Sequence, residues 1–258
     1  MIIYCTDFSE KDISFARNNN MGLEILKYSN PNFADNFDKN HPQMSATLAG
    51  MNGIAMHGAM HDTLHASVDP LIQEVAKKRF VQSMKIAAFH GINRVVFHSS
   101  YRKHLNGAST AAIDGFLGRS IGFWRDLEES IPDGMTIFIE NVEDEDPEIF
   151  LQIFKGINSP KIRCCFDIGH AYCSRAVSLN RWIDVLGAYI GHVHMHDNNG
   201  NFDEHLPLGH GGIPLAGAIN KILFSVGEDI PFVLECDIEE SAKWLLNIGF
   251  DIGHGHGA

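Results

Sequence analysis

The sequence lacks the features of several classes of protein. Its 258 residues contain no apolar run close to the ~18–20 residues that cross a bilayer, so no membrane span is expected. The first residues carry neither a basic leader nor a small-residue cleavage site, so they do not predict a signal peptide. Positive charge is scarce: 20 Lys and Arg against 32 Asp and Glu give a net charge of -12, which disfavours a protein that coats duplex nucleic acid.

Cysteine is also sparse, and its spacing excludes a disulfide framework or a CxxC metal knuckle. There are five cysteines, an odd number, and most lie within apolar runs. Buried free thiols in a reducing compartment explain this pattern, so we expect a cytoplasmic protein.

The chain does contain enough apolar residues, 45%, for a full globular core. Short β-branched or aromatic runs alternate with longer stretches of helical periodicity, such as those over 72–87 and 113–127. Eight such runs are predicted as strands: Ile2–Cys5, Leu23–Tyr28, Gly53–His57, Arg94–His98, Thr136–Glu140, Ile162–Asp167, Ile190–His194 and Pro231–Glu235.

Eight strand-then-helix units in about 250 residues predict an α/β fold, a single (β/α)8 TIM barrel. An open doubly wound sheet is the alternative, but no glycine-rich phosphate fingerprint follows the first strand. No linker or change in composition divides the chain. We therefore expect one domain over 1–250, followed by a flexible Gly/His-rich tail over 251–258.

Histidines and carboxylates follow the predicted strands at their carboxyl ends. The sequence has 15 histidines, and six strands end on an imidazole or a carboxylate: His57, His98, Glu140, Asp167, His194 and Glu235. In a barrel these ends converge on one mouth, where active sites are built. A single histidine at a strand end is usually structural, but six converging side chains indicate a site.

Carboxylates gathered at one mouth would repel one another unless cations lay between them. Mixed imidazole and carboxylate donors favour zinc, manganese, iron or cobalt over magnesium and calcium. Two further spacings add donors. His170 follows Asp167 by three residues, and Asp203 and His205 alternate so that both can face one side.

With these residues in place, the sequence resembles the xylose isomerase-like TIM-barrel superfamily, and within it the endonuclease IV group of AP endonucleases. The resemblance runs from about His57 to Glu235 and implies up to three divalent ions, most commonly zinc, with manganese as an alternative. Two ions would lie on His57 and His98 and on Asp167, His194 and Glu235, with Glu140 between them. The third ion would lie on His170, Asp203 and His205.

The resemblance implies an enzyme of one of two kinds. The surplus of ligands favours hydrolysis of a phosphate ester, whereas sugar or sugar-phosphate isomerases and epimerases of the superfamily use one ion on Glu140, Asp167, His194 and Glu235. The catalytic residues that it implies are Glu140, Glu235 and His170. A metal-stabilised barrel that only binds a sugar is a third, non-catalytic alternative.

The sequence departs from the endonuclease pattern in ways that argue against long DNA as substrate. Ala59 and Met60 replace a Pro-Tyr pair, and no arginine lies between Arg17 and Arg79, so the loop after the second strand lacks one. The acidic run Glu143–Asp146 would repel a phosphodiester backbone. A small phosphate ester or sugar phosphate is therefore the expected partner. The cationic side chains expected to bind it are Arg102, Lys103 and Arg175.

Overall fold

A computed structural model describes residues 1–252 of the chain. His254 and His256 of the predicted tail, and the second Asp-Ile-Gly-His copy that ends at His254, lie wholly or partly outside the described residues. The boundary between domain and tail therefore stays a prediction.

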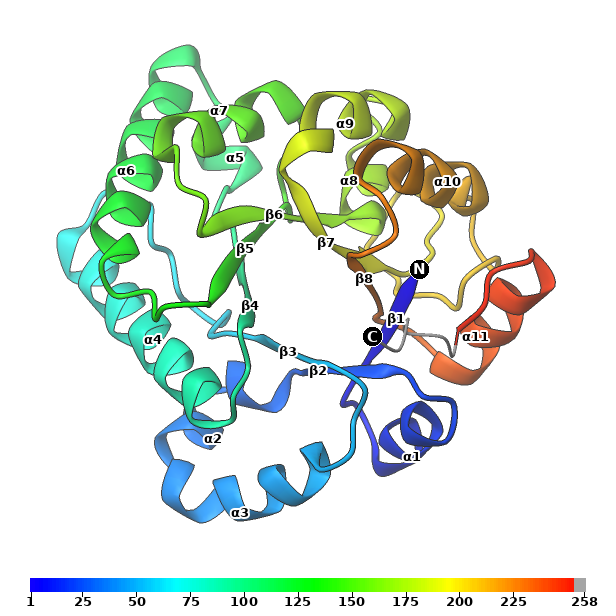
Figure 1. Cartoon of the computed structure of the whole chain (residues 1–258). Coiled ribbons are helices and arrows are strands. Elements are labelled where there is room, and N and C mark those ends of the chain that lie inside the picture. The colour runs from blue at the N-terminus through cyan, green and yellow to red at the C-terminus, as the bar shows by residue number, and fades with distance from the viewer. Residues whose placement is uncertain (253–258) are drawn as a thin grey trace.

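The eight strands are all parallel and form a closed barrel in chain order, with β1 pairing with β8 (Figure 1). This confirms the predicted (β/α)8 barrel. The strands are β1 Ile2–Thr6, β2 Gly22–Ile25, β3 Ile54–His57, β4 Arg94–His98, β5 Thr136–Glu140, β6 Ile162–Asp167, β7 Ile190–Met195 and β8 Pro231–Leu234.

The helices form a ring outside the strands (Figure 1). They are α1 Glu10–Asn18, α2 Pro31–Asp35, α3 Phe37–Leu48, α4 Pro70–Phe89, α5 Lys103–Asn106, α6 Thr110–Glu128, α7 Pro147–Ile157, α8 Ile168–Ser174, α9 Leu179–Leu186, α10 Leu215–Val226 and α11 Ile238–Asn247, with 3-10 turns at Lys27–Ser29 and Gly187–Tyr189. Several begin with the side-chain caps that their sequences predict: Asp146, for example, accepts a hydrogen bond from the Glu148 amide and precedes a proline at the first helical position. Within the described residues no helix is both long and apolar enough to cross a membrane.

The second strand is shorter than predicted. The predicted strand ran to Tyr28, but β2 ends at Ile25. The buried carboxylate of Asp7 accepts a hydrogen bond from the Leu26 amide at 2.6 Å, and the chain then turns into the 3-10 helix. The side chain of Asp7, which directly follows β1, therefore accepts the hydrogen bond that the Leu26 amide would otherwise donate to a neighbouring strand.

Most of the core lies between the strands and the helices, while the barrel interior holds two small apolar clusters. Val96, Phe138 and Cys165 form one interior cluster. Trp182 on α9 is fully buried in the outer core, and its ring stacks on that of Phe166 in β6. All five cysteines are free within the described residues, which confirms the prediction of unpaired thiols.

A register shift between β6 and β7 decides which side chains of β7 face the interior. Cys164 pairs with Ile190, but Cys165 pairs with His192, so Gly191 is the extra residue. A one-residue shift exchanges the two faces of a strand. The shift thus places Asp167 opposite His194. A Cβ on Gly191 would lie 2.9 Å from Phe138 and from the Arg163 guanidinium, so the tight bulge requires glycine.

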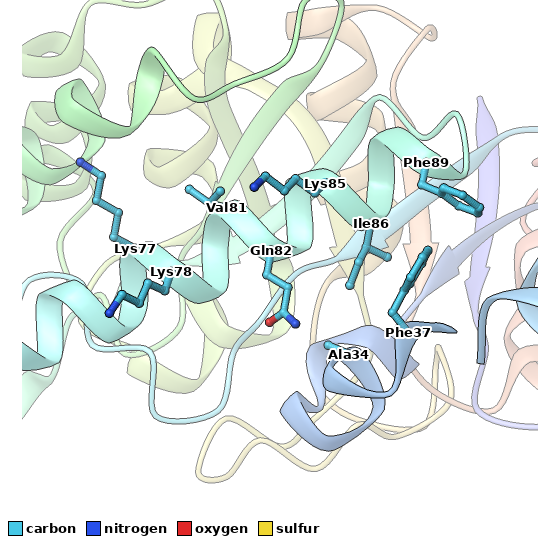
Figure 2. A pocket seen from close by; sticks show the side chains of 9 residues that line it. All are labelled: Ala34, Phe37, Lys77, Lys78, Val81, Gln82, Lys85, Ile86 and Phe89. Atoms are coloured by element: carbon cyan, nitrogen blue, oxygen red, sulfur yellow. The ribbon is translucent and has the colours of Figure 1, made fainter. Parts of the chain in front are cut away.

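A groove on the outer wall is separate from the strand ends. It is lined by residues of α2, α3 and α4, and Figure 2 shows Phe37 and Phe89 at one end of it, with their ring centroids 5.0 Å apart. Lys77, Lys78 and Lys85 lie along the same groove. Because these residues belong to the helical ring, the groove is not part of the barrel mouth.

Removing the Trp182 side chain tests the outer core. We expect Trp182→Ala to lower the free energy of unfolding by about 3–5 kcal/mol, because the cavity adds to the lost transfer free energy. Phe224→Ala is the matched control, because Phe224 is 93% exposed and should change stability by less than about 0.5 kcal/mol. Urea unfolding of the three proteins measures the difference; equal losses in both variants would contradict the assignment of the core.

Candidate metal centre

The structure brings all nine predicted ligands together in three clusters of donors at the barrel mouth. Within each cluster one donor atom per residue lies within 4.8 Å of the others. Cluster 1 is His57, His98 and Glu140; cluster 2 is Glu140, Asp167, His194 and Glu235; cluster 3 is His170, His196, Asp203 and His205. Glu140 belongs to both of the first two clusters.

Strand register explains why these residues meet. His98 and Glu140 are paired partners at the ends of β4 and β5, and Asp167 and His194 are paired partners on β6 and β7. His57 is the last residue of β3. Because all eight strands are parallel, their carboxyl ends share one face of the barrel, where the donors converge.

In cluster 1 the imidazoles face the Glu140 carboxylate. The Nε2 atoms of His57 and His98 lie 3.2 and 3.5 Å from Glu140 Oε2. The Nδ1 atom of His57 lies 3.1 Å from the Gly58 carbonyl oxygen, which can only accept. Nδ1 therefore carries the proton, and the Nε2 lone pair is free to bind a cation at the carboxylate side.

In cluster 2 His194 lies between two carboxylates. Its Nδ1 atom is 3.3 Å from Glu140 Oε1 and 3.4 Å from Glu235 Oε1. Asp167 is fully buried, and its Oδ2 atom has no hydrogen-bond partner among the described residues. A buried carboxylate oxygen without a donor is costly, so it marks a position that suits a cation.

Burial and neighbouring charges have opposing effects on the pKa values of the cluster 2 residues. Burial raises the pKa of Glu235, and the nearby Glu140 carboxylate adds to the effect. Burial would also raise the pKa of Glu140, but the imidazoles of His194 and His98 outweigh it and hold that pKa well below its usual range. For His194, burial lowers the pKa while neighbouring anionic groups raise it, and the net pKa is well above the usual value.

The raised pKa of His194 means that its protonated imidazole offsets the charge of the buried carboxylates in the metal-free chain, whereas burial lowers the pKa of His98 to about 3 and keeps that ring neutral. Divalent cations would offset the carboxylate charge in the same way on release of the His194 proton. The donors are nitrogen and oxygen atoms that face one another at distances that one ion can bridge; most are buried, whereas Asp203 and His205 are exposed. The residues of all three clusters fit divalent metal ions such as zinc or manganese.

Cluster 3 contains one residue more than the three predicted. Asp203 Oδ2 lies 3.2 Å from His170 Nε2 and 3.1 Å from His205 Nε2. His196 Nε2 lies 3.3 Å from Asp203 Oδ1. The observed register keeps His194 in cluster 2 and places His196 in cluster 3 as well.

Two buried carboxylates near the mouth were missed by the sequence analysis. Glu24 in β2 is fully buried and contacts His192 Nε2 at 2.7 Å and His194 Nε2 at 3.0 Å. Asp7 follows β1 and is 2% exposed. The signal for Glu24 was the alternation of β2, which places Glu24 on the interior face. Cys165, His192 and His194 also have donor atoms within 4.8 Å of one another beside it.

The three predicted substrate-binding cations are already engaged within the chain. Arg102 Nη1 lies 2.6 Å from Glu143 Oε1, and Lys103 Nζ lies 2.5 Å from Glu145 Oε1. Arg175 donates to the Asn199 carbonyl. The first two contacts pair part of the acidic run with positive charge. Exposed ion pairs of this kind are weak, so an anionic ligand can replace either carboxylate.

The fold and the site together define a class of protein: a (β/α)8 barrel with clustered residues that could hold metal ions at the carboxyl ends of its strands. The family model described as xylose isomerase-like TIM barrel matches residues 21–248, so the chain belongs to that family. This confirms the resemblance seen in the sequence.

Individual relatives are more distant. An uncharacterized protein of Methanocaldococcus jannaschii is 28% identical over 177 residues, which cover 66% of this chain and 59% of that protein. A probable endonuclease 4 of Natronomonas pharaonis is 26% identical over 56% of this chain and 58% of its own length. The chain thus spans less than two thirds of these relatives. A solved D-tagatose 3-epimerase-like protein shares the fold, with a TM-score of 0.74 and 22% identity over 96% of this chain and 97% of its own.

Asp7 should make the stability of the protein depend on pH. Burial raises its pKa from 3.8 to about 6, although the Leu26 amide and Lys27 oppose the shift. The folded chain therefore binds this proton more tightly than the unfolded chain does. The resulting penalty is full above about pH 6 and disappears as the pH falls toward 4. Relative to Asp7→Asn, the wild type should gain on the order of 2–3 kcal/mol between pH 7 and pH 4.

Urea unfolding across that pH range measures the difference between the two proteins. Asp133→Asn is the matched control, because the Asp133 side chain is fully exposed and should give no pH-dependent difference. A difference between wild type and Asp7→Asn that stays constant from pH 7 to pH 4 would exclude the raised pKa.

Proposed function

We propose that this chain is a divalent-metal-dependent enzyme that hydrolyses a small phosphate ester. The observation that supports it is the surplus of ligands: cluster 1 and cluster 3 add donors beyond the four residues that a single ion on cluster 2 would need. Sharing of Glu140 between clusters 1 and 2 would hold two ions side by side. Two adjacent ions suit in-line displacement at phosphorus. Zinc is the leading metal, with manganese as an alternative.

When bound, the ions would polarise the phosphoryl oxygens and activate water. The chain's own residues would set the geometry and move protons. Glu140 would hold clusters 1 and 2 together. Glu235, whose pKa burial raises, is a carboxyl group suited to exchanging a proton with the reacting oxygen. His170, next to both Glu140 and Asp203, would position the Glu140 carboxylate from the cluster 3 side.

The substrate would be small. The net charge of -12 disfavours long duplex DNA, although a probable endonuclease 4 is among the relatives. Arg102 and Lys103, at the β4 side of the mouth, and Arg175, after α8, would bind the phosphate by exchanging their present partners for it.

A sugar or sugar-phosphate isomerase or epimerase is the second candidate. Cluster 2 is self-contained, with two carboxylates, Glu140 and Glu235, on either side of His194. Such a pair could move a proton between neighbouring carbons of a ketose held at the mouth. The likeness to a D-tagatose 3-epimerase-like protein favours this alternative, although the likeness itself extends only to the fold.

Metal content distinguishes the candidates first. Protein purified without chelator or affinity tag is analysed by inductively coupled plasma mass spectrometry. Two ions per chain on clusters 1 and 2, identified as the ions lost when Glu140 is replaced, support the phosphoesterase and direct the assays to phosphodiesters, phosphomonoesters and an oligonucleotide with an abasic site. One such ion per chain favours the isomerase.

Glu140→Gln tests the shared carboxylate. We expect hydrolysis to fall by at least about 100-fold and the metal content to fall by up to two ions, because clusters 1 and 2 lose their common ligand. Glu74→Gln is the matched control, because Glu74 lies on the outer helix α4 and pairs with Lys78. An unchanged hydrolysis rate in Glu140→Gln would end the phosphoesterase proposal.

The isomerase predicts exchange of a carbon-bound proton with solvent. Ketoses and their phosphates are incubated with the metal-loaded enzyme in D2O and followed by proton NMR. The isomerase requires deuterium to enter at the carbon next to the carbonyl, and Glu235→Gln should then slow entry by about 100-fold or more. Phosphate release without deuterium entry decides for the hydrolase.

A further inference from the structure

Cluster 3 has an unusual arrangement of its imidazoles around one carboxylate. The Nε2 atoms of His170, His196 and His205 lie 3.1 to 3.3 Å from the oxygens of Asp203. They come from different segments: His170 from α8, His196 from directly after β7, and His205 from the loop that follows. Three imidazole nitrogens and one carboxylate thus face one small volume.

Two of these imidazoles are held in the tautomer that a metal ligand needs. Nδ1 of His170 lies 2.9 Å from the Asn141 carbonyl oxygen, and Nδ1 of His205 lies 2.7 Å from the Glu235 carbonyl oxygen. A carbonyl oxygen can only accept, so both Nδ1 atoms carry the proton. Each Nε2 then faces Asp203, and it donates a proton to that carboxylate in the metal-free chain. Once that proton is released, each Nε2 lone pair and the carboxylate are directed at one shared cation position.

Within cluster 3, His196 is the residue whose position the hydrogen bonds of the described residues do not explain. It is fully buried, and among the described residues neither of its ring nitrogens has a hydrogen-bond partner. Its ring stacks on His205, with centroids 3.9 Å apart and planes 15° from parallel. Leaving two buried ring nitrogens unsatisfied is costly unless one of them binds a ligand.

Asp167 is the other carboxylate within reach of His196, and it is already occupied. Its Oδ1 atom lies 3.3 Å from His196 Nε2 but accepts the His170 amide at 2.6 Å. The same carboxylate belongs to cluster 2. Asp203 has no such backbone bond among the described contacts, so His196 is better placed to share a cation with Asp203.

The backbone beside His196 leaves room for this ring. Gly169 lies in the Asp-Ile-Gly-His segment, and a Cβ there would lie 2.0–2.5 Å from three atoms of the His196 ring. Any larger residue would displace the imidazole. The glycine thus fixes His196 in position without contributing a donor of its own.

We propose that cluster 3 is a closed four-ligand site for zinc, with His196 as the fourth ligand and no coordination position left for substrate. Four protein ligands are typical of structural zinc, whereas catalytic zinc keeps an open position. The ion would join α8, the end of β7 and the following loop, and the reaction would take place on clusters 1 and 2. This inference rests on the proposed function only in assuming that the clusters bind metal, and it holds for either reaction.

The first test is retention of metal. Wild type, His196→Asn and Asp203→Asn are loaded with Zn²⁺, dialysed against a chelator and analysed for metal per chain. We expect the wild type to keep one slowly exchanging ion that both variants lose, with an affinity loss of at least about 10–100-fold, the range seen when only a supporting partner is removed. His210→Asn is the control, because its exposed side chain in the same loop belongs to no cluster.

The second test measures whether the site of the retained ion has an open coordination position. Co²⁺ replaces the retained Zn²⁺, and its visible spectrum is titrated with thiocyanate. A closed site leaves the wild-type spectrum unchanged, whereas an open site shifts it as the anion binds. Gly169→Ala keeps all four donors but displaces the His196 ring, so it should make the spectrum sensitive to the anion even if His196→Asn fails to fold.

The outcomes separate this inference from the proposed function. Absence of bound metal in every protein overturns both. Loss of the retained ion in Asp203→Asn, with His196→Asn unchanged from the wild type, overturns only the role of His196. An anion-sensitive spectrum in the wild type likewise overturns the closed site and returns cluster 3 to the reaction.

Discussion

The site depends on the cost of burying several carboxylates in one small volume. Glu24, Glu140, Asp167 and Glu235 are buried in the upper part of the barrel. Each would be driven to hold a proton if it stood alone. The imidazoles between them make the arrangement tenable, either by carrying protons themselves or by sharing divalent cations with the carboxylates. The alternation of carboxylate and imidazole, rather than any single residue, is what suits the mouth to divalent metal ions.

The backbone keeps that alternation in place. The extra residue at Gly191 turns His192 and His194 toward the interior, where Glu24 contacts both rings. Because Nε2 of His194 faces Glu24, its Nδ1 atom is left for Glu140 and Glu235. A carboxylate behind a ligating imidazole fixes the orientation of the ring and raises its basicity. Without the bulge, the hydrophobic side chains of β7 would face the carboxylates instead.

The sequence was sufficient for the barrel and for the convergence of the nine expected ligand residues at its mouth, because strand ends can be located from apolar runs and all converge in a parallel barrel. The sequence was insufficient where contacts of single side chains determine the local path of the backbone. Asp7 ends β2 early by accepting the Leu26 amide, which no periodicity reveals. Glu24 was missed because it lies within a predicted strand, whereas the candidate residues were sought at the strand ends. His196 continues the alternation of His192 and His194 directly after β7. Its place in cluster 3 could not be predicted, because it depends on the loop that brings Asp203 and His205 back to the mouth. The partners of Arg102 and Lys103 depend on loop conformation as well.

The polar interior also constrains where the stability of this fold comes from. A barrel interior is normally filled with branched apolar side chains, whereas here two small apolar clusters share it with Glu24, His192 and the ligands above them. Unfolding must therefore be opposed mainly by the layer between strands and helices, where Trp124, Trp182 and Phe150 are fully buried. Because the apolar layer between strands and helices is separate from the barrel interior, the interior can hold charged and polar side chains. The helical ring can then change in sequence without disturbing the metal centre, and the ligands can change without dismantling the core.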